Sequence, residues 1–315
     1  METVLSVKNL NKNFGSVQII KNASFDVYAG EIFGFLGPNG SGKTTTIKMI
    51  MGFLFPDSGD ITICGKNVRK EYEDAMNLVG GIVENPEMYK ELTGLQNLKM
   101  YARLHDGVTS ERINEVLELV DMKERANDKI KKYSLGMKQR IGVAQAIVHR
   151  PRLLILDEPT NGLDPAGIKE LRDILKKLAH EENTAVFVSS HMLAEMELMC
   201  DRVAIIDKGT ILAVKPIDEV LHMAVNNESC NFEISAYQIG SAKAVVTSLL
   251  GEGSVMEEKK TESEYCTLKV FANTDKIPEI NKALVEKDIN VYAITRKENT
   301  LEEAFINLTG GGQNA

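Results

Sequence analysis

The residues best suited to chemistry lie in one glycine-rich segment, which fits the pattern G-x-x-x-x-G-K-[ST] of a phosphate-binding loop. The apolar residues 31–36 before it predict a buried strand, and residues 45–51 after it predict a helix. A glycine-rich turn before a helix directs backbone N–H groups and the positive end of the helix dipole at one point. We therefore expect an anion site. The loop residues are Gly37, Pro38, Asn39, Gly40, Ser41, Gly42, Lys43, Thr44 and Thr45.

Two side chains of this loop give the site a specific chemistry. Lys43 supplies a mobile cation for the β- and γ-phosphates of a nucleotide, and the Thr44 hydroxyl is placed to bind Mg²⁺. The alternative is a glycine-rich turn that matches the pattern by chance. The strand before the loop and the helix after it favour the nucleotide site.

Two carboxylates, Asp157 and Glu158, follow the apolar residues Leu153–Leu156. Four apolar residues predict a buried parallel strand, and ligands of open α/β sheets bind at the carboxyl ends of such strands. Asp157 is placed to hold Mg²⁺ beside Thr44, and Glu158 to orient or deprotonate the water that attacks the γ-phosphorus. Asp-Glu after a strand is otherwise often a helix cap or a solvated turn, but a preceding phosphate loop favours catalysis.

His191 is the third candidate, because it follows the predicted strand Ala185–Val188 of the same sheet. There its ring can contact the γ-phosphate and hold both the water and Glu158. A lone histidine is more often structural, and we interpret the other four in that way. They are His105, His149, His180 and His222.

Composition narrows the class of protein. The 315 residues suggest about two domains, and 43% hydrophobic with 26% charged residues is typical of a globular protein. No apolar run reaches membrane-spanning length and the N-terminus lacks a signal sequence, so we expect neither a transmembrane segment nor a signal peptide. The four cysteines have no metal-ligand spacing.

A net charge of −8 argues against nucleic-acid binding. The basic segment Lys129–Lys132 is either a local patch or, more simply, a solvated helix end.

The order of elements predicts an α/β fold. Short antiparallel strands come first, helical periodicity follows at about residues 86–148, and strands then alternate with helices, which favours a mostly parallel core sheet. We expect this domain to cover residues 1–224. Residues 225–315 predict a small α+β domain. Its element order, β-α-β-β-α-β, suits a ferredoxin-like sandwich, and a closing helix is predicted at Leu301–Leu308.

A further motif resembles a known family. Ser134, Leu135, Gly136 and Met137 open a predicted helix and resemble the signature of ATP-binding cassettes. Residues 161–165, with Asp164, resemble the cassette D-loop, and Phe14 stands where that family stacks an aromatic ring on adenine. The resemblance covers residues 1 to about 220. It implies the P-loop NTPase fold of ABC cassettes with an inserted helical subdomain, and ATP hydrolysis with ATP and Mg²⁺ as cofactors. It also implies a head-to-tail homodimer, or a pair with another cassette chain.

One departure from the cassette pattern is Glu84, which replaces the usual glutamine. A carboxylate is a stronger Mg²⁺ ligand than an amide oxygen, although neutral drift within a subfamily is the alternative. Leu135 and Met137 also depart from the signature. These changes, with Tyr89 and residues 92–94, resemble cassette ATPases of the bacitracin-resistance and lantibiotic-immunity type.

That second resemblance implies a separate membrane permease that binds the transported substrate, a peptide antibiotic or similar amphiphile. The chain would then be peripheral on the cytoplasmic face of the membrane. We expect coupling near residues 84–98, where Tyr89, Leu92 and Leu95 either offer an apolar docking surface or belong to the helical core. Two other functions are a soluble cassette acting on ribosomes or DNA, and a regulatory module whose C-terminal domain senses a ligand.

Overall fold

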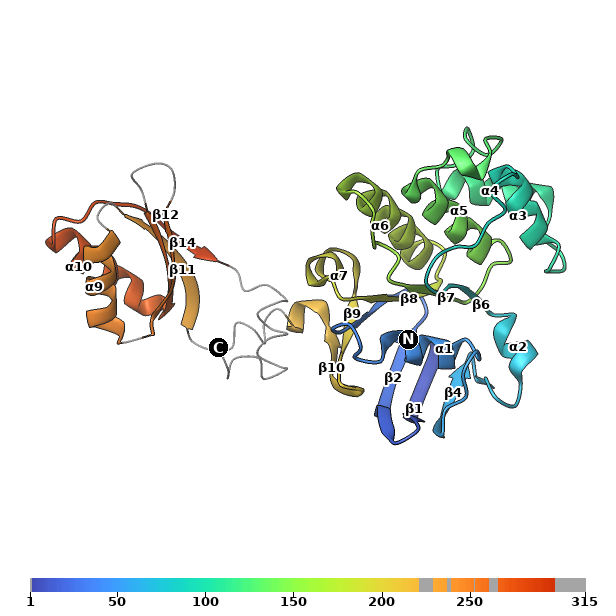
Figure 1. Cartoon of the computed structure of the whole chain (residues 1–315), viewed down its shortest axis with the longest axis horizontal. Coiled ribbons are helices and arrows are strands. Elements are labelled where there is room, and N and C mark those ends of the chain that lie inside the picture. Colours follow the sequence, from blue (N-terminus) through green and yellow to red (C-terminus); the bar gives the residue numbers. More distant parts are fainter. Residues whose placement is uncertain (1, 221–228, 237–238, 252, 261–265, 298–315) are drawn as a thin grey trace. The chain divides into compact units, whose positions relative to one another are not determined.

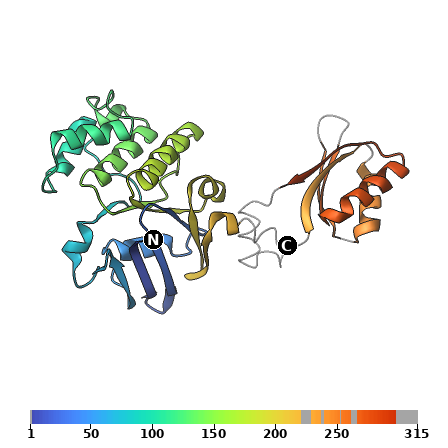
Figure 2. The same cartoon turned by 180° about the vertical axis from the view of Figure 1, so that it is seen from behind.

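The computed structural model describes residues 2–220, 229–236, 239–251, 253–260 and 266–297. Contacts divide the chain into two units, residues 1–217 and 218–315, which Figures 1 and 2 show from opposite sides. The domain boundary predicted between residues 224 and 225 lies outside the described residues. The predicted helix Leu301–Leu308 lies outside them as well, and so does His222.

The central sheet of the first unit has six strands in the order β10-β9-β3-β8-β7-β6. Neighbouring strands are parallel except β9 and β10, so the sheet is mostly parallel, as the sequence predicts. Strands β3 and β7 are buried along their whole length, which explains their unbroken apolar sequences. The strands are β3 (Ile32–Leu36), β6 (Val79–Ile82), β7 (Leu153–Asp157), β8 (Ala185–Ser190), β9 (Arg202–Asp207) and β10 (Thr210–Pro216).

A second sheet, in the order β2-β1-β4-β5, is antiparallel and comes from the beginning of the chain. Its strands are β1 (Thr3–Phe14), β2 (Val17–Tyr28), β4 (Ser58–Ile63) and β5 (Lys66–Asn67). The first two are longer than the short antiparallel strands that the sequence predicts. Four register shifts in their pairing bend the ribbon and hide the period of two that a regular strand would show.

Figure 1 shows α1 and the antiparallel sheet on one side of the central sheet, with α6 and the helical block on the other. The helical block, predicted for about residues 86–148, contains α3, α4, η1 and α5. The helices are α1 (Lys43–Ile50), α2 (Tyr72–Met76), α3 (Gly94–Ala102), α4 (Ser110–Leu119), the 3-10 helix η1 (Ile130–Lys132), α5 (Leu135–Ile147), α6 (Pro165–His180) and α7 (Leu193–Met199).

Aromatic side chains fill the core between the two sheets. Phe25 of β2 stacks on Phe33 and Phe187 with ring centroids 5.6 and 5.9 Å apart, and Phe35 contacts both Phe25 and Phe187. All four rings are buried. Because such rings bury large apolar areas in fixed geometry, they hold β3 and β8 rigidly, and both strands lead into the candidate site.

The second unit has the element order β-α-β-β-α-β and an antiparallel sheet in the order β12-β13-β11-β14. This order is that of a ferredoxin-like sandwich. A small core includes Ile234, Val246, Leu268 and Leu284. The elements are β11 (Ser229–Ala236), α9 (Ile239–Leu250), β12 (Val255–Lys260), β13 (Cys266–Asn273), the 3-10 helix η2 (Thr274–Lys276), α10 (Ile277–Glu286) and β14 (Val291–Lys297).

Candidate functional site

The predicted phosphate loop connects β3 to α1, and two of its glycines, Gly37 and Gly42, have no room for a side chain. A Cβ atom on Gly37 would lie 2.3 Å from the carbonyl oxygen of Ile206, which no side chain tolerates. Gly42 has φ +109°, and a Cβ there would lie 2.5 Å from Ile20. The loop is therefore held against β9 and β2. Asn39 and Gly40 are exposed within it, and Thr45 is half-buried at the start of α1.

Lys43 begins α1 and turns back over its own loop. Its Nζ donates to the carbonyl oxygens of Gly37 at 2.8 Å and Pro38 at 3.3 Å, and the side chain is only 6% exposed. Nearby, the buried Ser41 hydroxyl has no hydrogen-bond partner. A buried hydroxyl without a partner is costly in a protein interior, so Ser41 is suited to a polar ligand in this loop.

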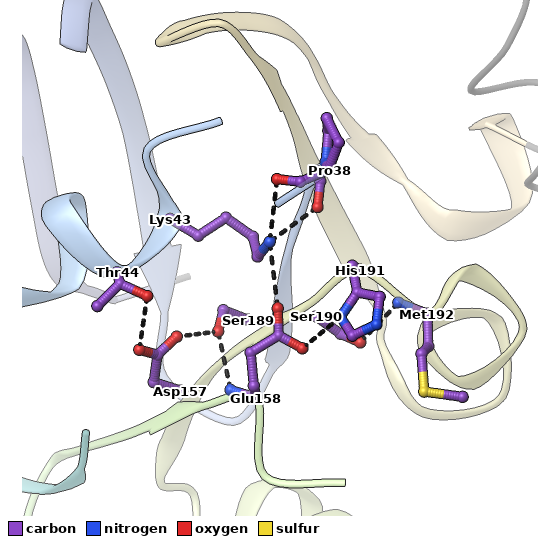
Figure 3. Close-up of polar contacts among 10 residues, drawn as sticks. Pro38, Lys43, Thr44, Asp157, Glu158, Ser189, Ser190, His191 and Met192 are labelled. Carbon is purple, nitrogen blue, oxygen red and sulfur yellow. Dashed lines mark hydrogen bonds and ion pairs between the residues drawn. The ribbon is translucent and has the colours of Figure 1, made fainter. Parts of the chain in front are cut away.

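Asp157 ends β7 directly beside the loop, as Figure 3 shows. Its Oδ2 accepts a hydrogen bond of 2.9 Å from the Thr44 hydroxyl, and its Oδ1 accepts one of 2.5 Å from the Ser189 hydroxyl. The structure thus brings together Thr44 and Asp157, two residues 113 positions apart. The sequence predicts this pair because both follow strands of one sheet.

The Glu158 carboxylate contacts two other side chains, one through each oxygen, in Figure 3. Its Oε1 lies 3.1 Å from Lys43 Nζ, and its Oε2 lies 2.8 Å from His191 Nδ1. Glu158 has φ +50°, a left-handed conformation that non-glycine residues adopt rarely and often at functional sites. This turn directs its carboxylate toward the loop, whereas Asp157 faces Thr44. One carboxylate, one lysine and one histidine therefore meet beside the predicted phosphate loop.

Two serines directly before His191 belong to the site, although the sequence analysis assigns them no role. Ser189 and Ser190 are fully buried at the end of β8, and both hydroxyls are hydrogen-bonded. Ser189 contacts Asp157 and the backbone N–H of Glu158, while Ser190 accepts from the N–H of Met192 at 2.8 Å. The available signal was a pair of hydroxyls that ends an apolar strand next to the Asp-Glu strand.

The signature-like residues cap α5. The Ser134 hydroxyl accepts from the N–H of Met137 at 3.2 Å, and Leu135 is 43% exposed. Asp164 caps α6 in the same way, accepting from the N–H of Gly167 at 2.9 Å. Figure 1 shows α5, which Ser134 caps, and α1, which Lys43 begins, on opposite sides of the central strands.

The start of α5 and the loop before α6 lie in contact with each other. A Cβ on Gly162 would lie 3.1 Å from Leu135, and one on Gly136 would lie 3.9 Å from Leu163. The large leucine in the signature therefore packs against the loop that leads to Asp164. Leu135 fills this contact with apolar volume that a glycine would lack.

Phe14 and Glu84 are both exposed, Phe14 on the first sheet and Glu84 beside α1. Phe14 ends β1 with 52% of its surface exposed, and Lys12 Nζ lies 5.6 Å from its ring centroid. Glu84 follows β6 with φ +69°, and its carboxylate pairs with Lys48 of α1 at 3.0 Å. Among the contacts of the described residues, Glu84 has none with Thr44 or Asp157. Its predicted metal role remains a prediction.

A family model described as ABC transporter matches residues 20–161. The chain is 46% identical over 313 residues to an uncharacterized ABC transporter ATP-binding protein, YhcH of Bacillus subtilis, covering 98% of this chain and 97% of the relative. It is 39% identical over 312 residues to the bacitracin transport ATP-binding protein BcrA of Bacillus licheniformis, covering 99% of each.

This chain is an ABC transporter ATP-binding protein. A solved structure described as the ATP-binding subunit of an ABC transporter is 30% identical, with a TM-score of 0.63 over 70% of this chain and 92% of that one. The comparisons confirm the predicted cassette fold, the ATPase class and the resemblance to the bacitracin type. No helix in the described parts of the chain has the length and apolar character needed to cross a bilayer.

The cassette's donor set fits Mg²⁺, which was predicted for Thr44, Asp157 and Glu84. A hydroxyl and a carboxylate oxygen within 2.9 Å are hard oxygen donors. No cluster of three or more acidic, histidine or cysteine residues suits a metal in the residues that the structure describes. Mg²⁺ needs none, because nucleotide sites hold it with one or two protein groups and the phosphates themselves. Thr44 and Asp157 are therefore the residues that would hold it.

Two histidines interpreted as structural form a pair in the cassette. The rings of His105 and His149 stack at 3.9 Å, and His149 Nε2 contacts the carbonyl oxygen of Val79 at 3.1 Å. Burial, and then the neighbouring His105, lower the pKa of His149 to about 4. Both rings line a cavity of about 330 Å³ between β6 and the helical block. A third histidine, His180, pairs with Asp201 on the surface.

Proposed function

We propose that this cassette powers export of, or self-protection against, peptide antibiotics of the bacitracin or lantibiotic kind through a separate membrane permease. The similarity to a bacitracin transport ATP-binding protein supports this, because it extends over 99% of both chains and so includes the second unit. An exporter for another drug, a lipid or an ion is the alternative. A soluble cassette acting on ribosomes or DNA fits less well with these relatives.

The observation that carries the hydrolytic part of the proposal is the Lys43–Glu158–His191 chain. Glu158 is the base that accepts a proton from the attacking water, because its carboxylate lies at the phosphate loop and is only 17% exposed. His191 donates to the Glu158 carboxylate through Nδ1–H and keeps that carboxylate oriented. Asp157 and Thr44 would hold Mg²⁺, which when bound would neutralise phosphate charge.

Two chains are needed to complete each nucleotide site in this proposal. Ser134, Leu135, Gly136 and Met137 form a helix start, where N–H groups and the dipole favour an anion. This start lies on the other side of the central sheet from α1, so we infer that it meets the nucleotide of a second cassette. Asp164 and its loop pack beside it and belong to the same contact.

Phe14 and Glu84 complete the proposed nucleotide environment. The Phe14 ring is exposed at the end of β1 and can stack on adenine, and Lys12 beside it adds a positive charge. Glu84 is held by Lys48, one helical turn after Thr44 on α1. We propose that the Glu84 carboxylate exchanges Lys48 for the metal when the site is loaded.

The permease docks at the cavity between β6 and the helical block. This cavity borders residues 82–87, which include part of the segment predicted for coupling. Tyr89 is 64% exposed, while Leu92 and Leu95 are half-buried, so the tyrosine supports the docking interpretation better than the leucines do. Gln145 and His149 are among the residues that line the cavity, and each has one buried nitrogen without a hydrogen-bond partner, Nε2 and Nδ1 respectively. They suit an apolar segment that brings hydrogen-bonding groups.

A complemented deletion strain tests the proposal. Loss of the gene should sensitise cells to bacitracin or a lantibiotic, and the wild-type chain should restore resistance. Glu158→Gln should not restore it, whereas Glu181→Gln, which alters an exposed carboxylate at the end of α6, should. Unchanged sensitivity of the deletion strain would refute the antibiotic assignment.

Retention of the permease tests the docking surface separately. Tyr89→Ala should reduce the permease that co-purifies from detergent. Tyr292→Ala, which alters a similarly exposed tyrosine of β14, should not. Equal retention by both variants would move the docking surface elsewhere, and ribosomes or DNA in place of a permease would favour the soluble alternative.

A further inference from the structure

The Ser189 hydroxyl lies between the two acidic residues of the site without touching the nucleotide loop. Ser189 is the register partner of Asp157 in the parallel pair β7–β8, and it is fully buried. Its Oγ donates to Asp157 Oδ1 at 2.5 Å and accepts from the backbone N–H of Glu158 at 3.0 Å. One hydroxyl is therefore used in both directions (Figure 3).

The first contact fixes the rotation of the Asp157 carboxylate. Oδ1 is held by Ser189 and Oδ2 by Thr44, so the two oxygens have different environments. Because Asp157 is only 3% exposed, water cannot readily replace the serine as donor. Without Ser189, only the Thr44 hydroxyl would hold this carboxylate.

The second contact holds the left-handed turn at Glu158. A glutamate with φ +50° is strained, and such a conformation persists only where surrounding contacts support it. The N–H of Glu158 points to Ser189, and the carboxylate then reaches Lys43 and His191. The same hydroxyl therefore acts on both acidic residues.

We propose that Ser189 is a positioning residue for ATP hydrolysis, which sets the Asp157 carboxylate toward Thr44 and the Glu158 carboxylate toward Lys43. This inference rests on the proposed roles of Asp157 and Glu158. It adds a hydroxyl of β8 that controls both residues at once. Ser189 does not contact the reacting atoms.

Removal of the hydroxyl tests the inference without adding volume. Ser189→Ala should lower turnover about 10–100-fold, as loss of a residue that orients a metal ligand typically does. The Mg²⁺ concentration for half-maximal activity should rise, while the KM for ATP should change little because the phosphate loop is intact. A purely structural role would lower the unfolding temperature and leave the Mg²⁺ curve unchanged.

An isosteric pair keeps the test decisive if Ser189→Ala folds poorly. Ser189→Thr and Ser189→Val add the same volume, and only the threonine retains a hydroxyl. Threonine should restore the Mg²⁺ response and most of the turnover, and valine should not. Equal turnover and equal Mg²⁺ curves for the two variants would overturn the proposal.

A parallel measurement separates this inference from the proposal beneath it. If Glu158→Gln hydrolyses ATP at the wild-type rate, the roles assigned to the acidic residues are wrong. The positioning role of Ser189, which depends on them, is then refuted as well. If Glu158→Gln is inactive while Ser189→Ala is fully active, only the positioning role is refuted. Neither measurement depends on the transported substrate.

Discussion

Lys43 and Glu158 meet in an ion pair of 3.1 Å between Nζ and Oε1, with 6% and 17% of their side chains exposed. The lysine also donates to Gly37 and Pro38, so its charge is shared between the loop and the carboxylate. A γ-phosphate would compete with Glu158 for the same cation. We infer that phosphate binding releases the carboxylate, which can then act on water next to His191.

Glu158→Gln should stop hydrolysis and preserve nucleotide binding. The amide has the same size but cannot accept a proton, so the rate should fall by about 10²–10⁴-fold, the usual contribution of a general base. Because ATP then persists in the site, an ATP-bound dimer should accumulate and elute as such in size-exclusion chromatography. A variant that stays monomeric with ATP and Mg²⁺ would contradict the two-chain site.

His191→Ala should lower hydrolysis strongly, because Glu158 loses the Nδ1 contact at 2.8 Å that orients it. His180→Ala is a matched control, since His180 also pairs with an acidic residue, Asp201, but away from the phosphate loop. Steady-state ATPase assays of both variants should differ by about tenfold or more. Similar rates would remove His191 from the mechanism.

Glu84→Gln should change the metal response more than the stability. The Glu84–Lys48 pair is exposed, with 67% and 40% of the side chains open to solvent, so its loss should lower the free energy of unfolding by about 1 kcal/mol at most. If the carboxylate binds Mg²⁺, half-maximal ATPase activity should need more Mg²⁺. Lys48→Gln should have the opposite effect, because it frees Glu84.

Unchanged Mg²⁺ curves for Glu84→Gln and Lys48→Gln would favour neutral drift at residue 84. Resistance measured in cells with the same two variants provides an independent reading. Unchanged ATPase activity together with unchanged resistance would leave the glutamate without a functional role.

His149 should make the fold less stable in mild acid. Burial and His105 lower the pKa of His149 from 6.5 to about 4. As pH falls below 6.5, His149 becomes protonated in the unfolded chain but stays neutral in the folded chain until about pH 4. The free energy of unfolding therefore decreases across this interval. His149→Phe should flatten the fall in unfolding temperature, and His180→Phe should not. Parallel curves for His149→Phe and the wild type would refute the assignment.

Local sequence determined the pieces of the site because each depends on neighbouring residues. Gly37 and Gly42 allow a turn that other residues cannot form, and Ser134 and Asp164 cap the helices that follow them. Apolar runs before Asp157 and His191 predicted buried parallel strands with polar ends. The helix predicted after the signature-like residues begins at Leu135, directly after the Ser134 cap.

Other contacts between distant segments, made away from the strand ends, could not be predicted in the same way. The pairing of Glu84 with Lys48, the stack of His105 on His149 and the packing of Leu135 against Gly162 each join elements whose spacing depends on helix packing. Sequence patterns report which face of an element is apolar. They do not report which side chains meet across two elements.

The chain by itself determined a phosphate loop, a strand ending in two acidic residues and a histidine after a third strand. Only the tertiary structure decided that Glu158 adopts a left-handed turn toward Lys43 and that one buried hydroxyl, Ser189, contacts both acidic residues. The reason is register. Parallel strands β7 and β8 align Asp157 with Ser189, and this alignment results from the packing of the whole sheet.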